Sequence, residues 1–289
     1  MDVAKYISFS TYYSGDKLRF TPDTPVTHRV LPHGAVVTLA GTGSELSAAA
    51  MIADDLTDKT EKLCLAHEAL CFDFSIVNPE LTYTLPAFQT AAGAMDIVSH
   101  CMDAYFNDIT DAPLMDAYFE GVIRTVMKEA VTALKEPRNY NARANLSLAA
   151  MMAWSDNMAV LGTPRDWGAH HCEVNVTTTF NRTHGETLAV ITPAWMKYTY
   201  KKNIEKYTKW AINCMGVNMD CYDSERTISN GIRRLEDWIR QIGLPLHLSE
   251  MGVTLEAIDK AECAKNSSPA GFVYQLSQNE IAEIYKYAE

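Results

Sequence analysis

The sequence predicts an α/β segment at the N-terminus that is joined to an all-α helical domain, with the boundary near Pro86. Before Pro86, short apolar runs alternate with turns that contain glycine and proline, which is typical of strands. After Pro86, apolar residues recur at intervals of three and four, the period of amphipathic helices. The chain has 289 residues, of which 47% are apolar, so it is long enough for two units. We therefore expect residues 1–86 to form the α/β part and residues 87–289 the helical part.

The N-terminal part begins with a predicted helix. Residues 1–15 carry apolar side chains at helical spacing and end at a glycine, whereas residues 16–32 hold three prolines and predict a loop. Residues 34–40, GAVVTLA, are an apolar, β-branched run bounded by turn residues, which indicates a strand. Further strands are predicted at residues 48–55 and 61–67, as a possible hairpin, and at residues 72–79.

The helical part is predicted to begin with two long helices, residues 86–106 and 112–136, because their apolar residues are spaced for one buried face. Asp223 and Ser224 are candidate caps of a later helix, and Gly243 is expected to end it. The other predicted helices are residues 142–159, 185–200, 223–243 and 277–289.

The composition argues against several classes of function. The chain has 25 basic and 36 acidic residues, a net charge of −11 and no basic face, so a nucleic-acid partner is not expected. No stretch approaches the ~20 apolar residues of a membrane span, and the N-terminus lacks the pattern of a signal peptide. The seven cysteines include no CxxC pair and indicate free thiols in a reducing compartment. We expect a cytoplasmic protein without a membrane partner.

A carboxylate and an imidazole stand four residues apart in the stretch DIVSH, at Asp96 and His100. Residues at this spacing share one face of a helix and can bind one cation together. Such pairs also occur by chance as capped or solvated side chains. The pair by itself therefore leaves both interpretations open.

Three of the eight histidines lie close together farther along the chain, at His170, His171 and His184. Two of these imidazoles, added to Asp96 and His100, would make a set of one carboxylate and three imidazoles. That set suits Fe(II) or Zn(II), whereas Ca²⁺ and Mg²⁺ prefer oxygen ligands. His171 is equally interpreted as a hydrogen-bonded core residue.

Several blocks of the sequence, in this order, resemble the iron-containing, or group III, alcohol dehydrogenases, and the butanol dehydrogenase branch most of all. These blocks include TLAGTGSE, NPELTYTLP, AAGAMDIVSHCMDAYF, HHCEVNVTTTFNRTHGETLAVITPAWMKY and IGLPLHLSEMGV. The resemblance runs over essentially the whole chain. It implies the architecture that this family shares with dehydroquinate synthase, in which a nucleotide-binding α/β domain, here partial, precedes an all-α metal-binding domain.

The resemblance also implies a reaction and a metal site. The family binds one divalent metal through an aspartate and a histidine four residues apart and two histidines fourteen residues apart. The matching positions here are Asp96, His100, His170 and His184. The implied reaction interconverts a small primary alcohol and an aldehyde by hydride exchange with NAD(H) or NADP(H), with Fe²⁺ or Zn²⁺ as a Lewis acid.

The family's nucleotide contacts match four further positions. These are Thr38 and Thr42, which lie before and within the turn GTGSE, then Lys62, and Leu85 beside the TYTL loop. A lysine can pair with anionic or hydroxyl groups of a nucleotide. For the assembly we expect a homodimer or a self-associating chain.

The chain departs from the family in two respects. The family carries a further N-terminal segment with a Gly-Gly-Gly-Ser turn that holds pyrophosphate, and this chain matches from just after that turn, so we expect an N-terminally truncated chain. The family's His-Glu pair in the histidine segment is replaced here by Val174 and Asn175. An alternative is therefore a non-catalytic metal-binding or interaction subunit derived from the family, and a metal-dependent lyase or cyclase is a third possibility.

Overall fold

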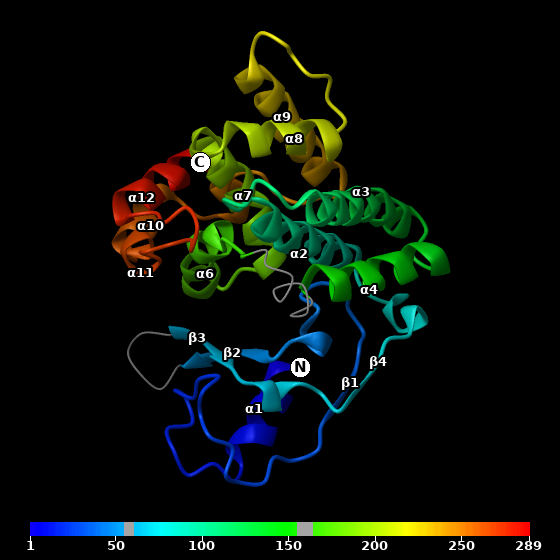
Figure 1. Ribbon diagram of the computed structural model, residues 1–289, viewed down its shortest axis with the longest axis vertical. Helices are drawn as coiled ribbons and strands as arrows, with labels where there is room; N and C mark the ends of the chain where they lie inside the picture. Colours follow the sequence, from blue (N-terminus) through cyan, green and yellow to red (C-terminus); the bar gives the residue numbers. More distant parts are fainter. Residues whose placement is uncertain (55–60, 155–163) are drawn as a thin grey trace.

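A computed structural model describes residues 1–54, 61–154 and 164–289 of the chain. The α/β part lies below the helical part in Figure 1, with the N-terminus among the strands. The first helix, α1 (Asp2–Ser10), is confirmed but is shorter than predicted. It ends before Thr11, Tyr12 and Tyr13, because β-branched and aromatic residues lose side-chain freedom in a helix.

The strands of the described residues form two separate two-stranded sheets. β2 (Ala49–Asp54) and β3 (Glu61–Ala66) pair antiparallel, so the predicted hairpin is confirmed. β1 (Gly34–Val36) runs parallel to β4 (Phe74–Ile76). The strand predicted at residues 34–40 stops at Val36, because β4 offers only three residues for pairing. The chain then continues as a turn toward the helical part.

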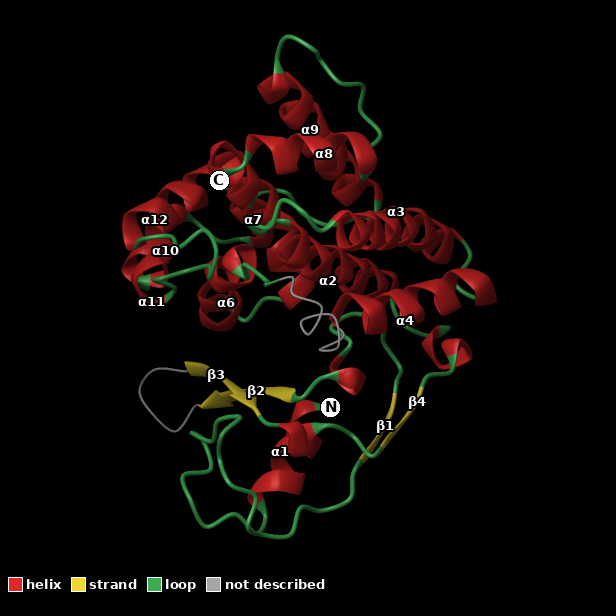
Figure 2. Cartoon of the chain, viewed as in Figure 1, coloured by secondary structure: helices red, strands yellow, loops and turns green. Residues whose placement is uncertain are grey.

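The long helices predicted after Pro86 are present. A cartoon coloured by secondary structure shows that helices joined by loops make up most of the upper part of the molecule (Figure 2). The last residues of the helix predicted at 142–159 lie outside the described residues. None of the described helices is long and apolar enough to cross a membrane. The helices are α2 (Ala87–Tyr105), α3 (Pro113–Lys135), α4 (Tyr140–Trp154), α6 (Gly168–Phe180), α7 (His184–Thr199), α8 (Ile204–Asn213), α9 (Ser224–Gln241), α10 (Leu255–Lys260), α11 (Cys263–Asn266) and α12 (Gln278–Tyr287).

Helix α2 forms the centre of the helical part. Every residue from Thr90 to Tyr105 is buried, because α3, α4 and α7 pack around it. A helix that is covered on all sides has no solvated face for its polar residues. Its few polar side chains, Asp96 and His100 among them, must therefore find partners inside the protein.

The two parts have separate hydrophobic cores. One large cluster joins the helices from Ala91 to Ala288, whereas Phe9, Leu65 and a few other residues form a small cluster under the hairpin. The small part is also held by the buried Lys5, whose Nζ donates to the carbonyl groups of residues 44, 47 and 49. On this ground we propose Pro86 as the domain boundary.

Candidate metal site

Three helices bring four polar side chains together. Asp96 and His100 project from adjacent turns of α2, and both are buried. His170 lies in the first turn of α6, and His184 is the first residue of α7. The start of α7 is fixed by a capping box, in which the Glu186 carboxylate accepts from the Thr183 backbone N–H at 3.3 Å. The first turns of α6 and α7 therefore place His170 and His184 beside α2.

The imidazoles converge on one oxygen atom. The distances from Asp96 Oδ1 are 3.4 Å to His100 Nδ1, 3.7 Å to His170 Nε2 and 3.3 Å to His184 Nε2. Candidate ligand atoms of Asp96, His100 and His170 all lie within 4.8 Å of one another. His184 is not in that mutually close group, although it is the nearest to Asp96. His184 nevertheless belongs to the cluster, because its Nε2 faces the same oxygen as the other two rings do.

The cluster contains buried polar atoms that lack a hydrogen bond within the described parts of the chain. Asp96 Oδ1, His100 Nδ1 and His170 Nε2 are among them. A buried polar atom without a partner costs about 1–3 kcal/mol, so such a cluster needs a further binding partner. A divalent cation would accept the lone pairs of all these atoms at once. One carboxylate oxygen and three imidazole nitrogens fit Fe(II) or Zn(II).

The charges of the cluster depend on one another. Burial alone raises the pKa of Asp96, but His100 and His184 outweigh it and hold this pKa well below 3.8. Burial opposes the positive charge of His184, but Glu173 and Asp96 raise its pKa to about 10. Asp103 likewise overcomes burial and raises the pKa of His170. In His100 burial prevails over the attraction of Asp96, and the pKa falls well below 6.5.

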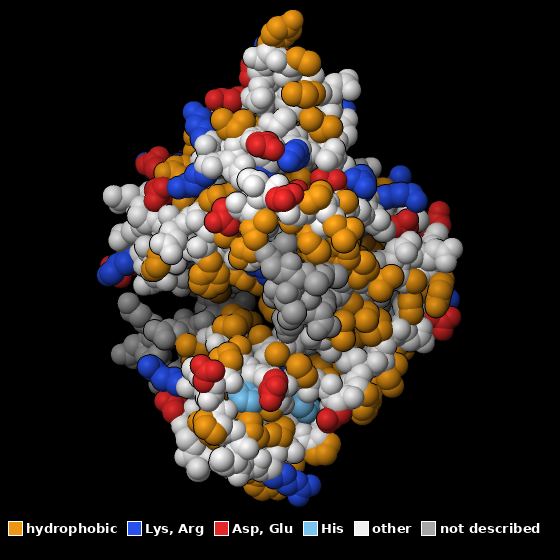
Figure 3. All heavy atoms as spheres, in the orientation of Figure 1, with side chains coloured by type: hydrophobic (Ala, Val, Ile, Leu, Met, Phe, Trp, Pro, Cys, Tyr) orange, Lys and Arg blue, Asp and Glu red, His pale blue; other side chains and the backbone are white. Residues whose placement is uncertain are grey.

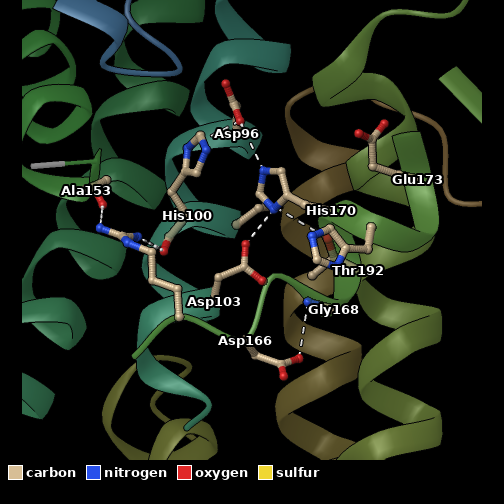
Figure 4. A network of polar contacts seen from close by, with 12 residues as sticks. Asp96, His100, Asp103, Ala153, Asp166, Gly168, His170, Glu173 and Thr192 are labelled. Carbon is tan, nitrogen blue, oxygen red and sulfur yellow. Dashed lines mark hydrogen bonds and ion pairs between the residues drawn. The ribbon is translucent and has the colours of Figure 1, made fainter. Parts of the chain in front are cut away.

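Two carboxylates that the sequence analysis did not single out lie behind the cluster. Asp103 Oδ2 is 2.5 Å from His170 Nδ1, and Glu173 Oε1 is 2.8 Å from His184 Nδ1. Figure 4 shows Asp103 pointing toward His170 from α2. The sequence holds a weak signal for both, since Asp103 follows His100 by three residues, and Glu173 follows His170 by three.

Aromatic rings enclose His100 on one side. The ring centroids of Trp154 and Trp167 lie 4.9 Å and 5.6 Å from that of His100, and both rings are edge-on to it. Trp167 adopts a left-handed backbone conformation with φ of 60°. This conformation costs a non-glycine residue about 1–2 kcal/mol. The strain at Trp167 is compatible with a site where surrounding structure dictates the conformation.

His171 does not join the cluster. Its Nδ1 accepts a hydrogen bond from the backbone N–H of Gly271 at 3.0 Å. The alternative interpretation of His171 as a hydrogen-bonded residue fits this contact, although the side chain is only partly buried. His170 and His171 therefore form a natural pair of test positions.

The residues matched to nucleotide contacts lie in different places. Thr38 and Thr42 are exposed, in the turn between β1 and the short helix η1 (Ser44–Leu46). That turn lies against α2, because a Cβ added to Gly93 would be 2.1 Å from the Ala40 carbonyl oxygen, and one added to Gly41 would be 3.4 Å from an oxygen of Asp96. The turn therefore adjoins the histidine cluster.

The other two positions are less informative. Leu85 is half-buried and lines a water-sized cavity of about 10 Å³ between the turn and α4, together with Ala40 and Arg143. Lys62 belongs to β3, opposite Ala53, but its side chain lies outside the described residues. Leu85 is thus near the turn that carries Thr38 and Thr42.

The fold joins an α/β domain to a helical domain whose buried carboxylate–imidazole cluster has the ligand types of a divalent-cation site. The model of iron-containing alcohol dehydrogenases matches residues 1–79, and the C-terminal model of the Fe-containing alcohol dehydrogenase family matches residues 90–288. The chain belongs to the iron-containing alcohol dehydrogenase family. The resemblance stated from the sequence, and the architecture that it implied, are confirmed.

Individual relatives agree with this assignment. The chain is 32% identical to NADH-dependent butanol dehydrogenase A of Clostridium acetobutylicum, over 99% of this chain and 74% of that protein. It is 33% identical to the NADPH-dependent aldehyde reductase YqhD of Escherichia coli, over 77% of this chain and 56% of that protein. The crystal structure of NADH-dependent butanol dehydrogenase A from Thermotoga maritima superimposes with a TM-score of 0.90 at 31% identity, over 99% of this chain and 73% of that one.

Proposed function

We propose that this protein is a metal-dependent oxidoreductase that interconverts a small primary alcohol and an aldehyde by hydride exchange with NAD(H) or NADP(H). Family membership supports an alcohol–aldehyde oxidoreductase with a metal and a nicotinamide cofactor. The observation that carries the proposal is the convergence of three imidazole nitrogens on Asp96 Oδ1, beside the turn that bears Thr38 and Thr42.

Asp96, His100, His170 and His184 would hold the metal, which we propose to be Fe²⁺ or Zn²⁺. When bound, such a cation supplies Lewis-acid polarisation of the alcohol or carbonyl oxygen, and the nicotinamide exchanges the hydride. The four side chains would fix the position of the cation relative to the turn at residues 38–42. The side chain of His184 is 27% exposed, whereas those of the other three are 10% or less. A substrate would therefore approach from the side of His184.

The nucleotide would lie along the turn at residues 38–42. Thr38 and Thr42 would offer hydroxyl groups to it, and Leu85 would offer an apolar surface nearby. Lys62 would pair with anionic or hydroxyl groups of the nucleotide. With the nucleotide in this position, the nicotinamide would lie next to Asp96, where hydride exchange needs it.

Adjacent histidines provide the test. The protein is loaded with Fe²⁺ without oxygen, or with Zn²⁺, and metal content and NAD(P)H-linked aldehyde reduction are measured. His170→Ala should lose the metal and the turnover, because it removes an imidazole from the cluster. His171→Ala should keep the metal stoichiometry, since His171 contacts Gly271 instead. Equal metal content in both variants would refute the assignment.

A non-catalytic metal-binding or interaction subunit is the second candidate function. Val174 favours it, because it lies half-buried on α6 one helical turn after His170, where the family carries a histidine. Metal binding through the same four side chains, without NAD(P)H turnover for any primary aldehyde from ethanal to hexanal, would support this alternative.

We also propose that the chain self-associates through the β1–β4 sheet. Val36, Phe74 and Ile76 are 55%, 60% and 50% exposed on it. Figure 3 shows hydrophobic side chains gathered over this region and the adjacent α4. Parallel strands are normally covered on both faces, and unpaired edges template pairing with another chain.

A further inference from the structure

His170 of α6 and His184 of α7 each point one ring nitrogen at a buried carboxylate and the other at Asp96. In His170, Nδ1 faces Asp103 at 2.5 Å and Nε2 faces Asp96 Oδ1 at 3.7 Å. In His184, Nδ1 faces Glu173 at 2.8 Å and Nε2 faces Asp96 Oδ1 at 3.3 Å. Both rings therefore stand between a carboxylate behind them and the proposed cation position in front.

These close contacts favour one position for the proton of a neutral imidazole, although neither Nδ1 atom is aligned for a hydrogen bond among the described residues. A neutral ring has one N–H donor and one lone pair. A carboxylate is an acceptor only, so it holds the proton on the nitrogen that faces it. The lone pair is then left on Nε2, the nitrogen that faces Asp96 in both residues.

We propose that Asp103 and Glu173 are positioning residues, which fix the proton of His170 and His184 on Nδ1 and hold both rings with Nε2 toward the metal. The inference rests on the proposed function, because it requires a metal at the cluster. Both carboxylates are buried, at 2% and 1% exposure, so solvent competes little for these contacts. Partners of this kind raise the basicity of a ligating imidazole and typically contribute 10–100-fold in metal affinity.

The two carboxylates differ in their surroundings. The other carboxylate oxygen of Glu173 accepts a hydrogen bond from the Thr177 hydroxyl group, and His184 is partly exposed. The Asp103–His170 pair is enclosed, and the Asp103 backbone carbonyl accepts from the Asp166 N–H at 2.8 Å. If Asp103 loses its charge, water cannot readily reach His170 Nδ1 to replace the lost contact. Asp103 should have the larger effect of the two.

His100 is positioned by different means. In the described parts of the chain, the only carboxylate paired with it is Asp96 itself. The ring instead stacks on that of His170, with centroids 4.7 Å apart, and is enclosed by Trp154 and Trp167. The fixed proton is thus a property of the two histidines that come from α6 and α7.

The test measures metal affinity on folded protein rather than turnover. Kd values for Zn²⁺ and Co²⁺ are obtained by competition with a chromophoric chelator for the wild type, Asp103→Asn and Glu173→Gln. We expect Kd to rise about 10–100-fold in Asp103→Asn and by a smaller factor in Glu173→Gln. In the wild-type Zn²⁺ form, ¹⁵N NMR should show a protonated Nδ1 in both histidines.

Glu120→Gln is the matched control. Glu120 is also a buried carboxylate of the helical part, but its partners are the Tyr105 hydroxyl group and the Asn213 amide. This variant is expected to lose stability and to keep the wild-type Kd within about twofold, as for a site without shared partners. A purely structural role of Asp103 and Glu173 would give the same pattern as Glu120→Gln.

The outcomes distinguish a failure of the positioning role from a failure of the proposed function. Wild-type Kd values in both folded carboxylate variants, or a protonated Nε2 in the wild type, would overturn the positioning role and leave the proposed function intact. A wild type that binds neither ion would overturn the proposed function as well. If Asp103→Asn does not fold, Glu173→Gln and the ¹⁵N measurement decide.

Discussion

The contact between α7 and α2 leaves no room for a side chain at Gly185. A Cβ atom added there would lie 2.1 Å from the carbonyl oxygen of Ala92, and that oxygen belongs to the backbone of a buried helix. An ordinary contact begins at 3.4 Å, so Gly185→Ala requires a displacement of about 1.3 Å. Gly185 follows His184, and Ala92 lies one helical turn before Asp96. The displacement therefore separates the two elements that carry these proposed ligands.

Two opposing effects determine how much Gly185→Ala changes the free energy of unfolding. Alanine is favoured over glycine within a helix by roughly 0.5–1 kcal/mol. Overpacking of a well-filled core costs about 1–3 kcal/mol, and backbone atoms on the other side of the contact do not rotate away. We therefore expect Gly185→Ala to lower the free energy of unfolding of the metal-free protein by about 1–2 kcal/mol. Because metal–ligand distances tolerate only about 0.2 Å, metal affinity should fall at least about tenfold.

Urea unfolding followed by far-UV circular dichroism measures the first quantity, and chelator competition measures the second. Gly121→Ala on α3 is the control, since an added Cβ there meets no atom of the described residues within 4 Å. It should raise the free energy of unfolding by about 0.5–1 kcal/mol and leave the Kd unchanged. If Gly185→Ala behaves like Gly121→Ala in both measurements, α7 does not pack on α2 as described.

Three further predictions concern protons, turnover and assembly. Because Glu173 and Asp96 overcome burial and raise the pKa of His184 to about 10, this ring is protonated at pH 7.5 in the metal-free protein. Zn²⁺ binding should therefore release a proton and weaken as pH falls, and calorimetry in buffers of different ionisation enthalpy that detects no release would contradict the ligand assignment. Val174→His should raise the steady-state turnover of the metal-loaded protein, and an unchanged or lower rate would mean that this position does not relay protons or contact nicotinamide. Phe74→Glu should abolish self-association in sedimentation velocity, whereas Tyr222→Glu, at another exposed ring, should not; a monomeric wild type would disprove the assembly.

Features that depend on local periodicity could be predicted from the sequence. The helix at residues 87–105 and the shared face of Asp96 and His100 follow from the 3.6-residue period, which needs no knowledge of neighbouring helices. The hairpin at residues 49–66 follows from two apolar runs separated by a polar stretch. The grouping of His170 and His184 with Asp96 came from the resemblance to a family, because their spacing of fourteen residues has no local geometric meaning.

Other features depend on which faces of the elements meet. β1 stops at Val36 because of the length of β4, a segment that lies far along the chain. The carboxylates of Asp103 and Glu173 occupy ordinary helical positions, and carboxylates at such positions are usually solvated. Their pairing with His170 and His184 exists only because α2, α6 and α7 turn these faces toward one another.

His170 and His171 show most clearly which features follow from the sequence and which depend on tertiary packing. The sequence by itself determined that two imidazoles are adjacent, and that one of them matches a family ligand, whereas the helix that carries them, α6, was not among the predicted helices. Only the tertiary structure decided that His170 faces Asp96, whereas His171 accepts from Gly271. Successive residues of a helix point about 100° apart, so the packing of α6 against α2 sends one ring into the cluster and the other away from it.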